Sequence, residues 1–103
     1  FIKGIGTMVI VWSINAKNEF KEIYRYILKD SYQNAIKVRR GIITAVLSLP
    51  EQPEKHRLDK YKKNNDGTWR AFEIYHYRIS YRVKQNEIRI VRLRHTSRSP
   101  LAY

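Results

Sequence analysis

The spacing of apolar residues changes from one segment of the chain to the next, and each spacing predicts a different element. Residues 9–12 are continuously apolar and mostly β-branched, which favours a strand in the interior of a sheet, buried on both faces. Through residues 16–28, and again through 35–49, apolar side chains recur every three or four positions, as on one face of a helix. Residues 77–84 alternate apolar with mostly cationic side chains, which predicts a strand with one apolar and one charged face.

Local signals mark where the two helices begin. Ser13 or Asn15 can cap the first helix. Asp30, with Gln33 three positions later, has the spacing of a capping box, so the second helix is expected to begin at Ser31. Because almost no loop separates the two helices, they are expected to form an antiparallel hairpin.

Residues 50–68 are the least regular part of the sequence. They contain two prolines, show almost no periodicity and carry five basic against four acidic side chains. We therefore expect a loop here, with Leu58 and Tyr61 as its anchors to the core.

Apolar segments flank the alternating strand on both sides. Phe72 and Ile74 mark a strand before it and residues 88–93 a strand after it, so three consecutive strands should form an antiparallel meander. The alternation slips at Ile90 and Val91, which a β-bulge or burial of the strand on both faces would explain equally well. The order β-α-α-β-β-β predicts an α+β domain in which a helical hairpin packs on a small, mostly antiparallel sheet.

Length and composition set the organisation of the chain. At 103 residues with 43% hydrophobic residues, it is expected to form one domain with a single core. Met8 is interpreted as the natural start, so we expect the domain to span residues 8–103 and residues 1–7 to be an expression remnant or an upstream extension. The absence of cysteine excludes disulfides and thiol chemistry and is compatible with a reducing cytoplasm. The apolar segment that ends at Trp12 is too short to span a membrane, so no membrane association is expected.

Positive charge is the strongest compositional feature. Twenty-one Lys and Arg against nine Asp and Glu give a formal net charge of +12, which favours a polyanion or an acidic protein as partner. Seven of the eleven arginines lie within residues 69–103, and Arg donates paired hydrogen bonds to phosphate. The sheet face opposite the helices is therefore a candidate nucleic-acid-binding surface, although a solvated strand face would carry similar charges for solubility alone. The candidate nucleic-acid-binding residues are Arg70, Arg82, Arg89, Arg92 and Arg94.

Few side chains are available for catalysis. Glycine-rich phosphate loops and metal-ligand spacings are absent from the sequence, so neither a cofactor nor a metal is expected. Metal-free phosphoryl transfer on RNA remains, because His, Arg, Lys and Tyr can supply a proton acceptor, a proton donor and cations around the phosphorane. Structural roles are the alternative: a strand-end histidine, an arginine paired with a neighbouring carboxylate, and a frayed chain end. The candidate catalytic residues are Arg78, His95, Arg98 and Tyr103.

Two consecutive segments resemble a known family. The stretch HYRISYRV at residues 76–83, followed by NEIRIVRLRHTSR at 86–98, resembles the RelE/ParE superfamily of bacterial toxins from type II toxin-antitoxin systems. The resemblance covers residues 9–103 and implies the same α+β fold. The upstream segments that are similar to this family are Trp12-Ser13, Lys29-Asp30-Ser31 with Ala35, and Leu49-Pro50.

The resemblance implies one of two activities. RelE-like members cut mRNA in the ribosomal A site, whereas ParE-like members poison DNA gyrase and are not known as nucleases. In the RelE-like case, Arg78 matches the arginine that contacts the scissile phosphate, and Arg98 matches a second arginine that acts on the transition state. Tyr103 falls near a tyrosine that stacks on or protonates the RNA, and His95 lies near a histidine that some relatives use. RelE also uses lysines on the preceding strand, where this chain offers only Arg70.

The nearly complete set of arginine, histidine and tyrosine slightly favours ribosome-dependent mRNA cleavage. Gyrase poisoning is the alternative, and a nucleic-acid-binding module without toxicity is a third hypothesis. In both toxic cases, the resemblance implies a cytoplasmic toxin that acts on ribosome-bound mRNA or on DNA gyrase and is neutralised by a cognate antitoxin. The charge of +12 suits an acidic antitoxin.

Overall fold

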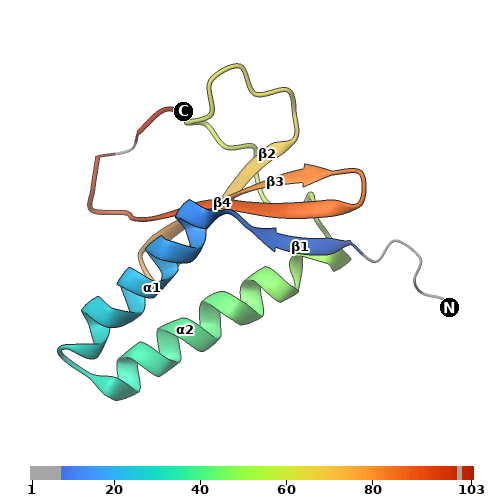
Figure 1. Ribbon diagram of the computed structural model, residues 1–103. Helices are drawn as coiled ribbons and strands as arrows, with labels where there is room; N and C mark the ends of the chain where they lie inside the picture. Colours follow the sequence, from blue (N-terminus) through green and yellow to red (C-terminus); the bar gives the residue numbers. More distant parts are fainter. Residues whose placement is uncertain (1–7, 100) are drawn as a thin grey trace, which may run out of the picture.

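The computed structural model describes residues 8–99 and 101–103, so the expectation for residues 1–7 lies outside the described residues. Two helices pack on a four-stranded sheet (Figure 1), which confirms the expected α+β fold with a helical hairpin on a mostly antiparallel sheet. The elements in chain order are β1 (Val9–Trp12), α1 (Ile14–Leu28), α2 (Tyr32–Leu47), the short 3-10 helix η1 (Leu49–Glu51), β2 (Trp69–Ile74), β3 (Tyr77–Lys84) and β4 (Glu87–His95).

The strands form one sheet in the order β1-β4-β3-β2. The meander of β2, β3 and β4 is antiparallel as predicted, and β1 runs parallel to β4. Both helices lie on one face of this sheet (Figure 1), and we call the opposite face the outer face. The expectation of an interior first strand is wrong, because β1 is an edge strand and Val9 is 62% exposed. Ile10 and Trp12 of β1 pack toward the helices instead, where the ring centroids of Trp12 and Phe20 are 5.2 Å apart.

Two serines cap the helices. The Ser13 hydroxyl accepts a hydrogen bond of 3.0 Å from the Ala16 amide, and the Ser31 hydroxyl accepts one of 3.0 Å from the Asn34 amide. The capping box expected at Asp30 is therefore wrong by one residue. Ser31 takes this role because its backbone is extended (φ −157°, ψ 114°), as an N-cap requires.

Val91 forms a β-bulge in β4. The register between β3 and β4 shifts by one residue between Ser80 and Tyr81, which leaves Val91 without a partner on β3. The Ser13 hydroxyl donates a hydrogen bond of 3.0 Å to the Val91 carbonyl, so the N-cap of α1 also holds the bulge. The bulge, one of the two explanations for the slipped alternation, is confirmed. The side chains of residues 92–95 therefore point to the opposite face of the sheet from the one that an unbroken alternation would give them.

Replacement of Ser13 by alanine is expected to lower the free energy of unfolding by about 2 kcal/mol, half from the lost cap and half from the lost bond to the bulge. Urea denaturation measures this loss. Ser31→Ala is the matched control, because the Ser31 hydroxyl caps only its own helix and its loss should cost about 1 kcal/mol. Equal losses in the two variants would show that the bond to Val91 contributes no stability.

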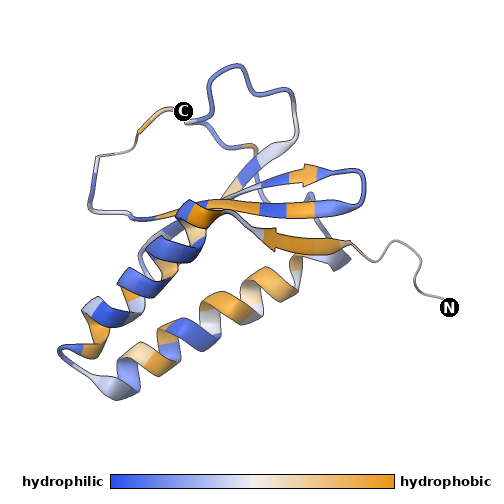
Figure 2. Cartoon of the chain, viewed as in Figure 1, coloured by the Kyte–Doolittle hydropathy of each residue, from blue (hydrophilic) through white to orange (hydrophobic). Residues whose placement is uncertain are grey.

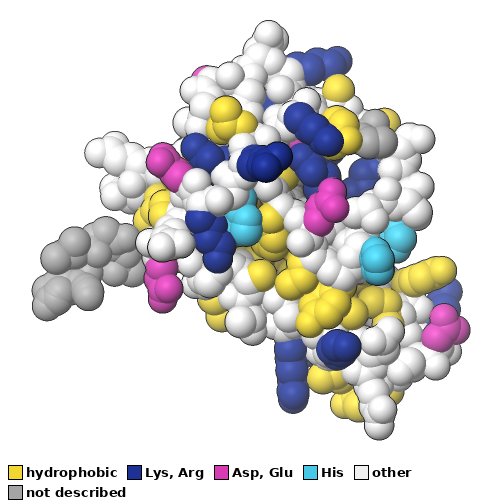
Figure 3. Space-filling model, turned by 180° about the vertical axis from the view of Figure 1, so that it is seen from behind, with side chains coloured by type: hydrophobic (Ala, Val, Ile, Leu, Met, Phe, Trp, Pro, Cys, Tyr) yellow, Lys and Arg dark blue, Asp and Glu magenta, His cyan; other side chains and the backbone are white. Residues whose placement is uncertain are grey.

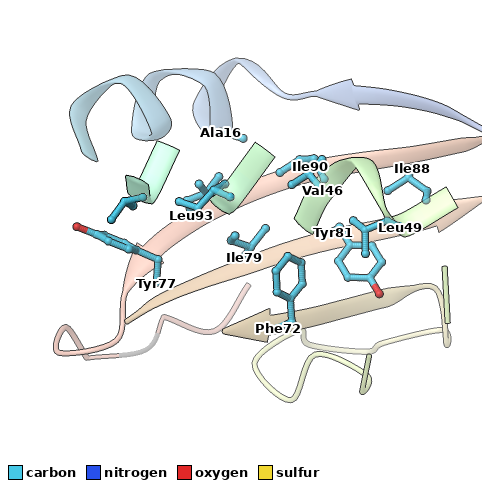
Figure 4. Packing of buried hydrophobic residues seen from close by; sticks show 12 residues of the cluster. Ala16, Val46, Leu49, Phe72, Tyr77, Ile79, Tyr81, Ile88, Ile90 and Leu93 are labelled. Carbon is cyan, nitrogen blue, oxygen red and sulfur yellow. The ribbon is translucent and has the colours of Figure 1, made fainter. Parts of the chain in front are cut away.

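The core lies between the helical hairpin and the sheet (Figure 4). Ile42 of α2, Ile79 of β3 and Ile90 of β4 are fully buried there. Tyr81 is also fully buried, and its hydroxyl donates a hydrogen bond of 2.8 Å to the Pro53 carbonyl in the loop. Figure 2 shows hydrophobic residues on both helices and along the strands of the sheet, with hydrophilic residues between them.

The loop between η1 and β2 is anchored differently from the prediction. Leu58 is 49% exposed, so its expected role as a core anchor is wrong, whereas Tyr61 is half-buried. Asp59 is instead 2% exposed. The backbone of Leu58 instead forms an isolated β-bridge to Arg70, along the edge of β2 that is not paired with β3. A carboxylate rather than an apolar side chain is therefore the most buried group of this loop.

Candidate functional site

Arginines stand opposite one another on the outer face of the sheet. The register pairs Arg78 of β3 with Arg94 of β4, and Arg82 with Arg89. Like charges that are directly opposite on neighbouring strands destabilise a sheet, so these pairs need anions to compensate them. In the view of Figure 3, Lys and Arg side chains lie beside Asp and Glu side chains.

Asp59 compensates part of this charge. Its carboxylate pairs with the Arg78 guanidinium at 2.9 Å and accepts a hydrogen bond of 2.5 Å from the Tyr103 hydroxyl. The same carboxylate accepts a hydrogen bond of 3.0 Å from the Tyr61 amide. Glu73, on β2, forms a second and longer ion pair with Arg78 at 3.5 Å. Asp59 therefore joins two of the four candidate catalytic residues, Arg78 and Tyr103.

These contacts fix the charge states of both partners of the short hydrogen bond. Burial would raise the pKa of Asp59, but hydrogen bonds from Tyr103, Arg78 and the Tyr61 amide outweigh it and lower that pKa below its usual value. Burial, and then the bond to the Asp59 carboxylate, raise the pKa of Tyr103 to about 12. At neutral pH the carboxylate is therefore charged and the phenol keeps its proton.

Aromatic rings from three segments lie against the arginines of this face. Trp69 comes from β2, Tyr61 from the loop before it, and Tyr103 from the segment after β4. Such cation–π contacts hold planar guanidinium groups in place and screen them from water. The distances from guanidinium carbon to ring centroid are 4.8 Å for Arg78 over Tyr61, 4.6 Å for Arg82 over Trp69 and 3.9 Å for Arg92 over Tyr103.

His95 and Arg98 lie away from this cluster. Because of the bulge, His95 is paired with the buried Tyr77, whereas its neighbour Arg94 faces outward with Arg78. The His95 ring is 5.0 Å from the Tyr77 ring and perpendicular to it, and its Nδ1 accepts a hydrogen bond of 3.0 Å from the Ser97 amide. His95 and Arg98 both line a groove of about 590 Å³ between α1 and the end of β4.

Arg70 also lies away from the outer-face cluster. The register pairs it with the buried Tyr81, on the helix-facing side of the sheet. Its guanidinium donates hydrogen bonds of 2.6 Å to the His56 carbonyl and 3.3 Å to the Glu54 carbonyl. The other four candidate nucleic-acid-binding residues, Arg82, Arg89, Arg92 and Arg94, share the outer face.

The arrangement separates the candidate catalytic residues into two pairs. Arg78 and Tyr103 meet at Asp59 on the outer face, and His95 and Arg98 line the groove beside α1. Proton transfer at one phosphate needs an acceptor and a donor within hydrogen-bond reach of the same atoms. Across residues 8–99 and 101–103, no three His, Asp or Glu side chains are placed to hold a metal ion.

Sequence reasoning missed Asp59, because no motif marks it. The loop contains a second aspartate, Asp66, which is exposed and bonds to Thr68 of the same turn. The two aspartates differ only in what the folded chain brings to them from distant segments. One weak signal exists, because Asp59 lies between Leu58 and Tyr61 and was thus already in a segment expected to touch the domain.

The fold and the comparisons together define the class of protein. Two solved structures have folds similar to that of this chain. The first is described as the chromosomal ParDE TA system from P. aeruginosa, with a TM-score of 0.66 and 22% identity over 87% of this chain and 97% of that one. The second is the YoeB dimer from Staphylococcus aureus, with a TM-score of 0.56 and 20% identity over 86% and 97%. The structure thus has the RelE/ParE-like fold.

A family model gives the finer assignment. The model of the ParE toxin of the type II toxin-antitoxin system parDE matches residues 10–100, so the chain belongs to the ParE toxin family. Membership makes it a toxin of a type II toxin-antitoxin system, with a cognate antitoxin as partner. No curated protein sequence matches the chain. None of the helices within the described residues is long and apolar enough to cross a membrane.

Proposed function

We propose that this toxin stops growth by binding DNA gyrase and poisoning it, without cleaving RNA itself. This is the second of the two activities that the family resemblance implies. The observation that carries the proposal is the separation of the four residues that RNA cleavage would require. Arg78 and Tyr103 are bound to Asp59 on the outer face, and His95 and Arg98 line a groove beside α1.

The charge states at Asp59 also favour binding over catalysis. A tyrosine whose pKa is raised to about 12 is a weaker acid and gives up its proton to RNA less readily, and its hydroxyl already donates a hydrogen bond to the Asp59 carboxylate. Arg78 is 17% exposed and shared between two carboxylates, so little of its charge is available for a scissile phosphate. The match to the ParE family model agrees with this preference.

The same proposal covers the location and the antitoxin. Gyrase acts in the cytoplasm, so the toxin acts there as well. A domain with a net charge of +12 attracts an acidic partner, and we propose that the cognate antitoxin neutralises it with an acidic, flexible segment.

Two purified systems test the activity. Added to gyrase and relaxed plasmid, the toxin is expected to abolish supercoiling and to trap cleaved plasmid. Added to ribosomes programmed with mRNA, it is expected to leave the A-site codon intact. Arg98→Ala is an informative variant because Arg98 is exposed, so its replacement should not alter folding. A-site cleavage by the wild-type toxin that is lost in Arg98→Ala would overturn the proposal, as would unaltered supercoiling.

A further inference from the structure

Ser99 and residues 101–103, which we call the strap, lie back over the outer face after β4 ends. The Arg94 Nε donates a hydrogen bond of 3.1 Å to the Ser99 carbonyl, and the Arg92 guanidinium donates one to the Leu101 carbonyl. Both arginines belong to β4 and point outward. The strap therefore covers the outward side of β4 with backbone carbonyls.

Tyr103 anchors the strap to the loop that precedes β2. Its amide donates a hydrogen bond of 3.0 Å to the Tyr61 carbonyl, and its own carbonyl accepts one of 2.6 Å from the Lys63 amide. Its hydroxyl donates to the buried Asp59 carboxylate, and its ring lies edge-on to Trp69 at 5.8 Å. In Figure 1 the red chain end lies beside this loop. The Tyr103 side chain thus joins the strap to Asp59, which is the only buried Asp or Glu among the described residues.

The arginines under the strap differ from the others on the outer face. Arg78, Arg82 and Arg89 each have a carboxylate partner. Among residues 8–99 and 101–103, Arg92 and Arg94 have no carboxylate within ion-pair distance. Their guanidinium groups donate hydrogen bonds to carbonyls of the strap, and Arg92 also lies over the Tyr103 ring. A neutral carbonyl is a weaker acceptor for guanidinium than a charged oxygen, and the Glu19 carboxylate of α1 attracts both arginines only from beyond ion-pair distance, so these two positive charges are compensated less than the others.

We infer that the outer face is a binding surface for the phosphate backbone of duplex DNA, and that the strap covers this surface until DNA displaces it. The choice of DNA rests on the proposed function, because gyrase holds duplex DNA while it is poisoned. Arg92 and Arg94, which have no ion-pair partner among the described residues, supply the attraction, and the Tyr103–Asp59 hydrogen bond resists the opening.

Displacement exchanges weaker acceptors for stronger ones. Phosphate oxygens bond to a guanidinium in pairs and carry the charge that the strap carbonyls lack. Opening also uncovers the ring of Trp69, which can then contact the sugar-phosphate backbone. Because only the open form binds, the apparent affinity for DNA is reduced by the fraction of molecules in which the strap is open.

Fluorescence anisotropy with a labelled 20-base-pair duplex and no gyrase tests the inference. Tyr103→Phe removes the hydroxyl and keeps the ring, so it should tighten DNA binding roughly tenfold at a given salt concentration. Arg92→Gln with Arg94→Gln in that background should weaken binding and lower the slope of log affinity against log salt by about two. Tyr32→Phe is the matched control, because Tyr32 is 65% exposed at the start of α2, and it should bind like the wild type.

Hydrogen exchange gives an independent measure of strap opening. The Lys63 amide is protected by its bond to the Tyr103 carbonyl, so its exchange should accelerate when DNA is added to the wild-type toxin. Circular dichroism verifies that every variant is folded. If Tyr103→Phe binds DNA no more tightly than the wild type, or if DNA leaves the Lys63 amide protected, the inference is wrong.

A different ligand is the remaining outcome. A glutamate-rich peptide that binds more tightly to Tyr103→Phe, under conditions in which DNA does not bind, would assign the surface to an acidic protein and overturn the inference. Strap-dependent DNA binding without any effect on supercoiling would instead leave the inference intact and contradict the proposed function.

Discussion

Replacement of Asp59 by alanine is expected to lower the free energy of unfolding by about 3 kcal/mol and the melting temperature by roughly 15 °C. The buried carboxylate is the acceptor for both the Arg78 guanidinium and the Tyr103 hydroxyl. Its removal leaves a mostly buried arginine without its closer partner and releases the hydroxyl that holds the strap. Urea denaturation followed by circular dichroism measures the loss.

Glu73→Ala is the matched control for this variant. Glu73 pairs with the same guanidinium at 3.5 Å, but its side chain is 59% exposed, so its loss should cost less than about 1 kcal/mol. Similar losses in the two variants would show that burial of the Asp59 carboxylate adds nothing to the pair.

The acid dependence of stability gives a second signature of Asp59. Its pKa is lower in the folded protein than in the unfolded chain, so the folded state binds fewer protons in the acid range. Its contribution to stability is therefore complete above the unfolded-state value near 3.8 and is lost as the pH falls through the lower folded-state value. Asp59→Ala should lose less stability between pH 5 and about pH 3 than the wild type does.

Tyr81→Ala should have a still larger effect, a loss of about 4 kcal/mol in the free energy of unfolding. The Tyr81 ring is fully buried and lies 6.1 Å from the Phe72 ring, and its hydroxyl holds the loop at the Pro53 carbonyl. Removal of the ring therefore creates a cavity and frees the loop together.

Tyr81→Phe separates the two contributions, since it keeps the ring and removes only the hydroxyl. It should cost about 1 kcal/mol, and the same urea titration measures both variants. A loss as large as that of Tyr81→Ala would show that the bond to Pro53, rather than packing, dominates at this position.

The parts of the fold that depend on local periodicity could be predicted from the sequence. The helices and the two faces of β3 follow from apolar spacing, because a side chain's direction is fixed by its position along a regular element. The position of β1 at the sheet edge could not be predicted, because an apolar run gives burial preference but not the order of strands. The exposure of Leu58 and the burial of Asp59 could not be predicted for a related reason: the loop has no period, so only contacts from distant segments decide which side chain is buried.

The candidate site shows the same division. Arg78 and Arg82 lie on one charged face, as the alternation predicts. Arg70 does not share that face, and its position could have been predicted, because it alternates in step with Phe72 and Ile74 and faces the helices with them. The contact between Asp59 and Tyr103 joins residues 44 positions apart, and no spacing rule reaches that far.

The single extra residue at Val91 has a consequence for how toxins of this fold are compared. In a strand, an inserted residue turns every later side chain to the opposite face, so a histidine and an arginine three positions apart have no fixed orientation. Two chains with the same H-x-x-R letters can present them on opposite sides of the sheet if only one of them carries the bulge. An aligned H-x-x-R motif therefore identifies relatives. The presence or absence of an inserted residue in the last strand decides to which face of the sheet the side chains of that motif point.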